Sequence, residues 1–193
     1  MKAAIITIVL ALATGAVVAD VITLPLNGSA GLYDINTPAW SYNFDLGVTF
    51  SQISNVYIDW SGQITGGQSQ WMSNPNLMTI DGTLIAYLGA YPQLRAASVS
   101  RGISTYPDPE PFEVQTTFSI LYGSNTWDNL LDGKEIISID LNSSFKTIPE
   151  IKTIDYGRVV LNDATLTIEG TVVPEPASLL LIGIGGLSLR RRS

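Results

Sequence analysis

Histidine and cysteine are both absent from the 193-residue sequence. Ser-His-Asp and Cys-His catalytic groups therefore cannot be built, and neither can a zinc site with imidazole or thiolate ligands. A bound metal would need oxygen ligands, which favours calcium or magnesium. Acid–base chemistry would fall to carboxylates, tyrosines or lysines. Because no disulfide can form, the fold must depend on a buried core.

Basic residues are scarce in the central part of the chain. Residues 20–173 contain six lysines and arginines against sixteen aspartates and glutamates, a net charge of 6 − 16 = −10, compared with −7 for the whole chain. Nucleic acid carries dense negative charge and is therefore a poor partner. This segment is long enough to form one domain with a proper core.

The N-terminus has the three parts of a secretory signal peptide. Lys2 is followed by an apolar run over residues 3–12 and by small residues that end at Ala19. We expect signal peptidase to cleave between Ala19 and Asp20, so that residues 1–19 are removed. The alternative is an N-terminal transmembrane anchor that stays in place.

The C-terminus combines a stiff spacer, an apolar segment and a basic end. The spacer Val173-Pro174-Glu175-Pro176 is held extended by its prolines, so a helix can begin only after it. Uncharged residues 177–189 would form a helix about 20 Å long, short of the roughly 30 Å hydrocarbon core. Arg190, Arg191 and Arg192 favour the cytoplasmic side, which places the preceding domain outside.

Residues 173–192 resemble the PEP-CTERM sorting signal of bacterial exported proteins, in the order of Pro-Glu-Pro, apolar helix and arginine cluster. The resemblance implies recognition by an exosortase-type membrane protease and removal of the helix near Pro174, Glu175 or Pro176. It also implies a transient anchor in the inner membrane and a final location at the cell surface or outside the cell. Such proteins tend to accompany exopolysaccharide production. The alternative is a single-pass anchor that is never processed.

Apolar and polar residues alternate along most of residues 20–173, whereas helical periodicity is nearly missing. Strands are predicted at residues 21–26, 42–50, 56–60, 77–80, 83–88, 95–100, 112–120, 135–141, 157–161 and 164–172. Asp81-Gly82 predicts a type I′ turn that joins two of them as a hairpin. We expect an antiparallel all-β fold, a β-sandwich of jelly-roll-like type.

Two segments interrupt the alternation. Residues 62–76 are rich in glycine and glutamine and predict a long loop, and residues 105–111, with three prolines, predict an extended or turn connection. Residues 126–131 predict a short helical turn. Tryptophan beside amides offers a sugar both a flat apolar platform and hydrogen bonds. A glycan-binding cluster is therefore predicted, comprising Trp71, Gln68, Gln70, Asn74 and Trp127. Trp60 continues an apolar strand face and is expected to be buried.

Carboxylates surround the predicted helical turn. Asp128, Asp132 and Glu135 are weak candidates for a calcium site, since their spacing does not follow the EF-hand order. A solvated acidic loop without any cofactor is the simpler interpretation. Two carboxylates facing each other across a cleft could instead make a glycoside hydrolase.

Together these features predict an exported protein that is not an enzyme. Its domain would have a structural or adhesive role in the extracellular matrix and would bind carbohydrate. Two alternatives stay open, a carboxylate-dependent polysaccharide hydrolase and a matrix scaffold that binds no ligand.

Overall fold

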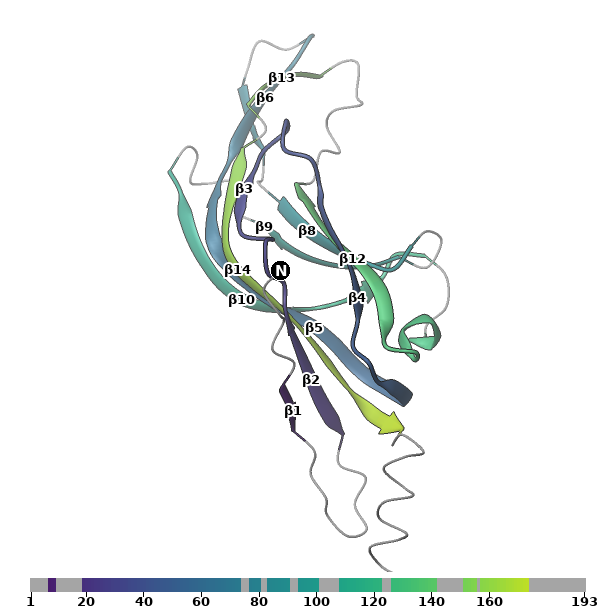
Figure 1. Cartoon of the computed structure of the whole chain (residues 1–193). Coiled ribbons are helices and arrows are strands. Elements are labelled where there is room, and N and C mark those ends of the chain that lie inside the picture. Colours follow the sequence, from purple (N-terminus) through teal and green to yellow (C-terminus); the bar gives the residue numbers. More distant parts are fainter. Residues whose placement is uncertain are drawn as a thin grey trace, which may run out of the picture.

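The computed structural model describes residues 7–9, 19–73, 77–80, 83–90, 94–100, 108–122, 126–141, 151–155 and 157–173. These residues are mostly strand (Figure 1). The elements are β1 (Thr7–Val9), β2 (Asp20–Pro25), β3 (Gly31–Tyr33), β4 (Trp40–Asp45), β5 (Thr49–Thr65), β6 (Gly67–Trp71), β7 (Leu77–Ile80), β8 (Thr83–Leu88), β9 (Arg95–Ser100), β10 (Glu110–Thr117), β11 (Ser119–Ile120), the 3₁₀ helix η2 (Asp128–Leu130), β12 (Lys134–Leu141), β13 (Ile151–Asp155) and β14 (Arg158–Val173).

The strands form three sheets. Sheet A has the order β1-β2-β14-β5-β10, with β3 also paired to β14. Sheet B has the order β11-β9-β8-β12-β4, and sheet C has the order β13-β6-β7. Every described pairing is antiparallel. The predicted antiparallel all-β fold is therefore confirmed, while the β-sandwich of jelly-roll-like type stays a prediction.

Strands β5 and β14, of 17 and 16 residues, form the long curved ladder at the centre of sheet A (Figure 1). Their register runs from Thr65 opposite Arg158 to Thr49 opposite Val173. Glycine is required at Gly62, because a Cβ there would lie 2.2 Å from the carbonyl oxygen of Val160. The ladder sets the length of the domain.

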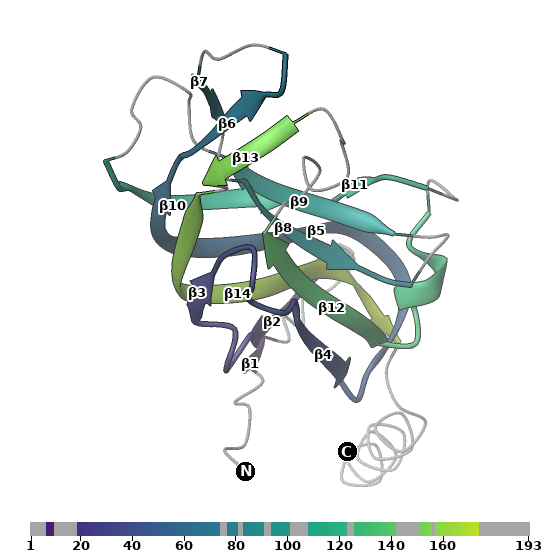
Figure 2. The ribbon, with the colours of Figure 1, turned by 90° about the horizontal axis from the view of Figure 1, so that it is seen from above.

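One apolar core is shared by sheets A and B, which lie across from each other in Figure 2. Sheet A contributes residues such as Ile58 and Leu166, and sheet B contributes residues such as Leu84 and Ile137, all of them fully buried. Trp60 is 2 % exposed, and its Nε1 donates a hydrogen bond to Thr116 Oγ1 at 3.2 Å. The expectation that Trp60 is buried is confirmed.

Two predicted strands are wrong because each contains a crossing between sheets. The segment 42–50 divides at Gly47 into β4 of sheet B and β5 of sheet A, and the segment 112–120 divides at Phe118 into β10 of sheet A and β11 of sheet B. Gly47 has a φ of +68°, and its N–H donates to the Asp45 carboxylate at 2.9 Å. Apolar residues keep alternating through both crossings because the two sheets face the same core.

Other boundaries also differ from the prediction. The segment 56–60 lies inside β5, and the segments 157–161 and 164–172 are one strand, β14, with an irregular register between Leu161 and Asp163. Most of the predicted loop 62–76 is strand, in β5 and β6. The polar composition of this segment wrongly predicted a loop, because β6 pairs with β7 and β13 in a small third sheet.

The predicted hairpin over residues 77–88 is also wrong. Strand β7 pairs with β6 in sheet C, whereas β8 pairs with β9 and β12 in sheet B. The turn residues Asp81 and Gly82 lie outside the described part of the chain. Period-two alternation identifies a strand but does not select its partner.

The two predicted targeting segments are described only in part. Within the predicted signal peptide, β1 pairs with β2, and Ala19 directly precedes β2. The predicted helix 177–189 lies beyond the last described residue, Val173. Among the residues described, no helix has the length and apolar character needed to cross a membrane.

Gly133 provides a test of the crossing between β4 and β5. Its φ is +73°, and a Cβ would lie 2.2 Å from the carbonyl oxygen of Val48. We expect Gly133→Ala to lower the free energy of unfolding by about 3 kcal/mol or more, because backbone strain and a clash with fixed backbone add together. Gly47→Ala is the matched control, since its φ is +68° but open space surrounds it. It should cost only about 1–2 kcal/mol in urea denaturation. Equal losses in the two variants would contradict the predicted clash.

Candidate functional site

The two predicted processing points lie side by side at one end of sheet A (Figure 1). Asp20, the expected first residue after signal cleavage, pairs with Gly170 of β14. Its carboxylate also accepts a hydrogen bond from the N–H of Val172 at 3.0 Å. Val173, the first residue of the predicted sorting signal, is still paired with Thr49. We call this the processing end of the domain.

The rest of the predicted sorting signal follows this end without a linker. Val173 is the last residue of β14, so the hinge begins at the next position. The other predicted signal residues lie outside the described part of the chain, namely Pro174, Glu175, Pro176, Arg190, Arg191 and Arg192.

Three of the five predicted glycan-binding residues lie on β6 of sheet C. Gln68 and Gln70 are half-buried on β6, and Trp71 ends that strand. The side chain of Trp71 and the whole of Asn74 lie outside the described residues. This predicted cluster therefore stays a prediction.

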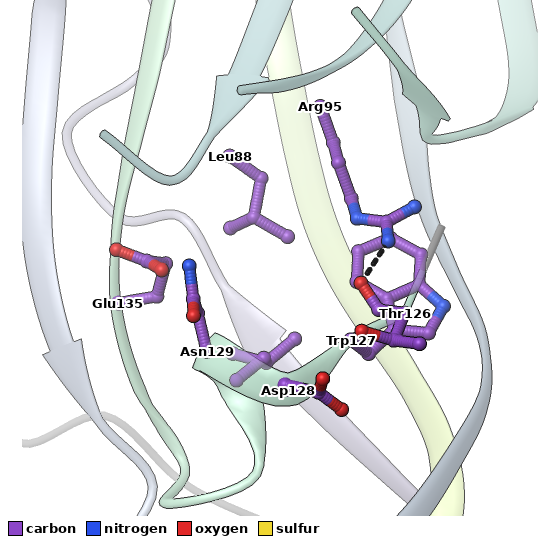
Figure 3. Close-up of a pocket in the computed structure, with 8 residues that line it drawn as sticks. Leu88, Arg95, Thr126, Trp127, Asp128, Asn129 and Glu135 are labelled. Carbon is purple, nitrogen blue, oxygen red and sulfur yellow. Dashed lines mark hydrogen bonds between the residues drawn. The ribbon is translucent and has the colours of Figure 1, made fainter. Parts of the chain in front are cut away.

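Trp127, the fifth predicted residue, is covered on one ring face by Arg95 (Figure 3). The guanidinium carbon lies 3.6 Å from the ring centroid, and the guanidinium donates a hydrogen bond to the carbonyl oxygen of Thr126. Arg95 is only 8 % exposed, and this burial lowers the pKa of its guanidinium. A sugar cannot stack on this face of Trp127 while the guanidinium occupies it.

A hollow of about 70 Å³ lies beside this pair, bordered by Leu88, Asn129 and Glu135 (Figure 3). It is far smaller than the roughly 300 Å³ at which ligand pockets begin. The pKa of Glu135 is raised by its burial, although its carboxylate accepts a hydrogen bond from the N–H of Ile136 at 2.9 Å. The geometry fits a structural contact between η2 and sheet B better than a sugar site.

Trp127 also borders a larger hollow of about 370 Å³. Its lining includes Gln52 and Ser54 from β5 and Asp128 from η2. Since β5 begins opposite the last residues of β14, this hollow lies at the processing end.

The calcium candidates do not form a cluster. Across the part of the chain that the structure describes, no three His, Cys, Asp or Glu side chains gather where they could hold a metal ion. Glu135 borders the hollow beside Arg95, whereas the Asp132 carboxylate accepts the backbone N–H of Lys134 at 3.0 Å. Asp128 borders both hollows around Trp127. These carboxylates therefore lie in separate local surroundings.

A second aromatic site, which the sequence analysis missed, lies on the edge strand β4. The rings of Trp40 and Tyr42 stack with centroids 6.1 Å apart and an interplanar angle of 24°. Trp40 is half-buried, Tyr42 is 41 % exposed, and Leu32 of β3 is 47 % exposed. We call these three residues, with the hollow beside them, the Trp40–Tyr42 surface.

The hollow of this surface measures about 370 Å³ and is largely apolar, with main-chain groups around it. It is lined by Gly28, Ser29, Ala30, Gly31, Leu32, Tyr33, Thr37, Pro38, Ala39, Trp40 and Ser41. Buried Ser29 Oγ has no hydrogen-bond partner among the described residues. A polar group of this kind needs a partner, which a bound water or a ligand hydroxyl would supply.

The wall of the hollow is fixed by Tyr33. Its hydroxyl donates a hydrogen bond of 2.6 Å to the carbonyl oxygen of Ser29, four residues earlier. Burial, with a smaller contribution from the negative charge of Asp140, raises the pKa of Tyr33 to about 12. The phenol therefore stays a hydrogen-bond donor at neutral pH. The adjacent turn is tied by Asp34, whose carboxylate accepts hydrogen bonds from Asn36 and Thr37.

The Trp40–Tyr42 surface was missed for a physical reason. Trp40 and Tyr42 share a strand face with Phe44, which is 4 % exposed, so alternation predicts that all three point into the core. The strand begins at the edge of the core, so Trp40 is only half-buried against it and Tyr42 is exposed. The turn-forming residues just before them, 34–38, were a signal that this strand begins at a boundary.

We expect the contact between Arg95 and Trp127 to stabilise the fold. Arg95→Met should lower the free energy of unfolding by about 2–4 kcal/mol, because it removes a buried cation–π contact and a charged hydrogen bond. Lys134→Met is the control, since the ion pair of Lys134 with Asp45 at 2.9 Å is largely exposed. The control should show no measurable change in urea denaturation. A loss for Arg95→Met no larger than that of the control would contradict a stabilising role.

Glu135 should make stability depend on pH. Burial raises the pKa of its carboxyl above the ordinary 4.5 in the folded protein, so folding favours the protonated form. This contribution is complete below about pH 4.5 and is lost as the pH rises through the folded pKa. Between about pH 4 and pH 7, Glu135→Gln should therefore lose less free energy of unfolding than the parent protein. Equal pH dependence in the two proteins would show that Glu135 is not desolvated.

Comparison with known proteins identifies the C-terminus. A family model described as the PEP-CTERM protein-sorting motif matches residues 172–192. The match extends over the sorting segment only. No curated protein sequence matches the chain significantly. The chain thus carries a PEP-CTERM sorting signal at its C-terminus, the signal of an exported protein that an exosortase processes at the membrane.

Proposed function

We propose that this protein is sorted to the cell surface as a polysaccharide-binding domain with an adhesive or structural role in the extracellular matrix. The observation that carries the proposal is the Trp40–Tyr42 surface, where Trp40 borders a hollow of about 370 Å³ and its ring stacks with that of Tyr42. Sugar rings present apolar C–H faces that pack on aromatic platforms, and their hydroxyls need hydrogen-bonding groups nearby. Ser41 and the main chain of residues 28–31 supply such groups.

The charge of the domain favours a neutral glycan. Residues 20–173 carry a net charge of −10, which repels polyanions such as uronic acid polymers. The residues that line the hollow include no Lys or Arg to neutralise a carboxylate or sulfate. Neutral hexose polymers therefore fit this surface better than acidic ones.

Binding without cleavage fits this surface better than hydrolysis. A glycoside hydrolase needs two carboxylates on either side of the scissile bond. The residues that line the hollow, all of them described, include no Asp or Glu. The runner-up is a hydrolase and the third candidate is a scaffold that binds no ligand. Release of reducing sugar from a bound glycan would favour the hydrolase.

The position of the surface suits a protein sorted through a membrane anchor. Asp45 pairs with Lys134 near the processing end, while Trp40 pairs with Ile139, about 17 Å further along the strand. On the neighbouring sheet, β3 pairs with Val159 to Leu161, near the start of β14, whereas the sorting signal follows its end. The surface is thus displaced from the membrane while the tail is still attached. The larger hollow beside Trp127 lies at the processing end, and it is therefore less accessible to polymers while the tail is attached.

Binding should depend on both aromatic rings. We expect Trp40→Ala to abolish binding of the processed protein to neutral polysaccharides in a panel of glucans, mannans and galactans, and Tyr42→Ala to weaken it at least tenfold. The reason is that stacking on an aromatic face contributes about 0.5–1.5 kcal/mol for each ring beyond the apolar area that it buries. Affinity electrophoresis or calorimetry would measure the change.

Tyr122→Ala is the matched control, because Tyr122 is 56 % exposed and follows β11, which lies at the opposite edge of sheet B from β4. It should bind like the parent protein. The proposal fails if no neutral glycan binds, or if binding survives in the Trp40→Ala, Tyr42→Ala double variant with its melting temperature unchanged.

A further inference from the structure

The two outer edges of sheet A differ in how they resist pairing with another strand. On the β10 side, the edge carries Glu110, Pro111 and Glu113. Charged residues and proline at an edge discourage further strands, because proline lacks an N–H and like charges repel. On the opposite side, β2 has Asp20 and Pro25 only at its two ends, and its middle residues Val21, Ile22 and Thr23 include no charge and no proline.

The β2 edge accepts a strand in the structure. Strand β1 lies along it in antiparallel register, with Thr7 opposite Thr23, Ile8 opposite Ile22 and Val9 opposite Val21 (Figure 1). Yet β1 belongs to the segment that signal peptidase is expected to remove. Cleavage after Ala19 would leave this edge open in the mature protein, and an open edge whose middle carries no charge is a template for pairing.

We propose that a second copy of the mature chain covers this edge, with its own β2 in place of β1. The sequence supports the exchange, because β1 reads Thr-Ile-Val and β2 reads the same residues in reverse order, Val-Ile-Thr. Two antiparallel copies of β2 centred on Ile22 therefore reproduce the Ile–Ile pair. The flanking pairs become Val21 opposite Thr23 of the second copy, and these side chains have nearly the same volume.

The arrangement is a two-fold interface in which the same residues serve both copies. The carboxylate of Asp20 does not repel a second copy at this interface, since it accepts a hydrogen bond from the N–H of Val172 within its own chain. The pairing joins two copies of sheet A into one continuous sheet. A few backbone hydrogen bonds make a weak contact, so the dimer should form at the high local concentration of a surface layer. This inference depends on removal of the signal peptide and is independent of glycan binding.

Disulfide trapping tests the register directly, because the chain has no cysteine of its own. In the Val21→Cys, Thr23→Cys double variant, the thiol at position 21 of one copy lies opposite the thiol at position 23 of the other. Opposed residues of antiparallel strands have Cα atoms about 4.5–5.5 Å apart, within the range for a disulfide. We expect the processed protein, recovered from an exporting bacterium and mildly oxidised, to run as a covalent dimer on a non-reducing gel.

Matched controls separate this register from chance collision. The single variants Val21→Cys and Thr23→Cys should cross-link several-fold less, because the two thiols of the dimer then occupy the same position in each copy and are not opposite each other. Val114→Cys, on the β10 edge, should also stay monomeric, although Val114 is 40 % exposed. Val21→Lys should lower the mass measured by light scattering at high protein concentration, with the melting temperature unchanged.

Three results would overturn the proposal. The first is a double variant that cross-links no more than the single variants. The second is a parent protein that stays monomeric at the concentration at which the double variant is tested. The third is a processed protein that still begins before Thr7, because β1 would then keep the edge covered.

Discussion

The antiparallel ladder between β5 and β14 is the constraint on which the other features depend. β2 and β3 pair with the edge of β14 that faces away from β5, and β10 pairs with the edge of β5 that faces away from β14. Sheet A is therefore assembled on these two strands. The apolar faces of the two strands also supply much of the core that sheet B covers, including Ile58 and Leu166. Because the ladder runs the length of the domain, it separates the processing end, at Val173, from the region where β3 pairs with β14. The position of the Trp40–Tyr42 surface relative to the membrane anchor follows from this separation.

Alternation in the sequence predicted several of the strands that stay within one sheet, and the physical reasons for the failures are local. β9 and β12 were predicted nearly to the residue, because each is half-covered by the core over its full length. The segment 42–50 failed because Gly47 turns the chain from one sheet to the other without disturbing the inward side chains. The loop prediction for residues 62–76 failed because strands of a small sheet need few apolar residues. The hairpin prediction failed because alternation alone does not show which strands pair, and β7 and β8 belong to different sheets.

The sites were less predictable than the strands. The sorting signal was legible because its chemistry is local, and the family model matches it at residues 172–192. The role of Trp127 depended on Arg95, which lies 32 positions earlier in the chain and covers one face of its ring. Trp40 and Tyr42 were indistinguishable from core residues, since the sequence does not show where the core ends along β4. Aromatic side chains at strand ends therefore need a structure before they can be divided between core and surface.

The central claim is that the exported domain binds glycan at the Trp40–Tyr42 surface, and the four tryptophans allow one measurement to test it. Each indole N–H gives its own signal in a ¹H–¹⁵N correlation NMR spectrum of the processed protein, and each tryptophan lies in a different place. Trp40 is at the surface, Trp60 is in the core, Trp71 is in sheet C and Trp127 lies under Arg95. Titration with neutral oligosaccharides should shift the Trp40 signal in a saturable way and leave the other three in place. Shifts confined to Trp71 or Trp127, or no saturable shift with any of the sugars, would contradict the claim.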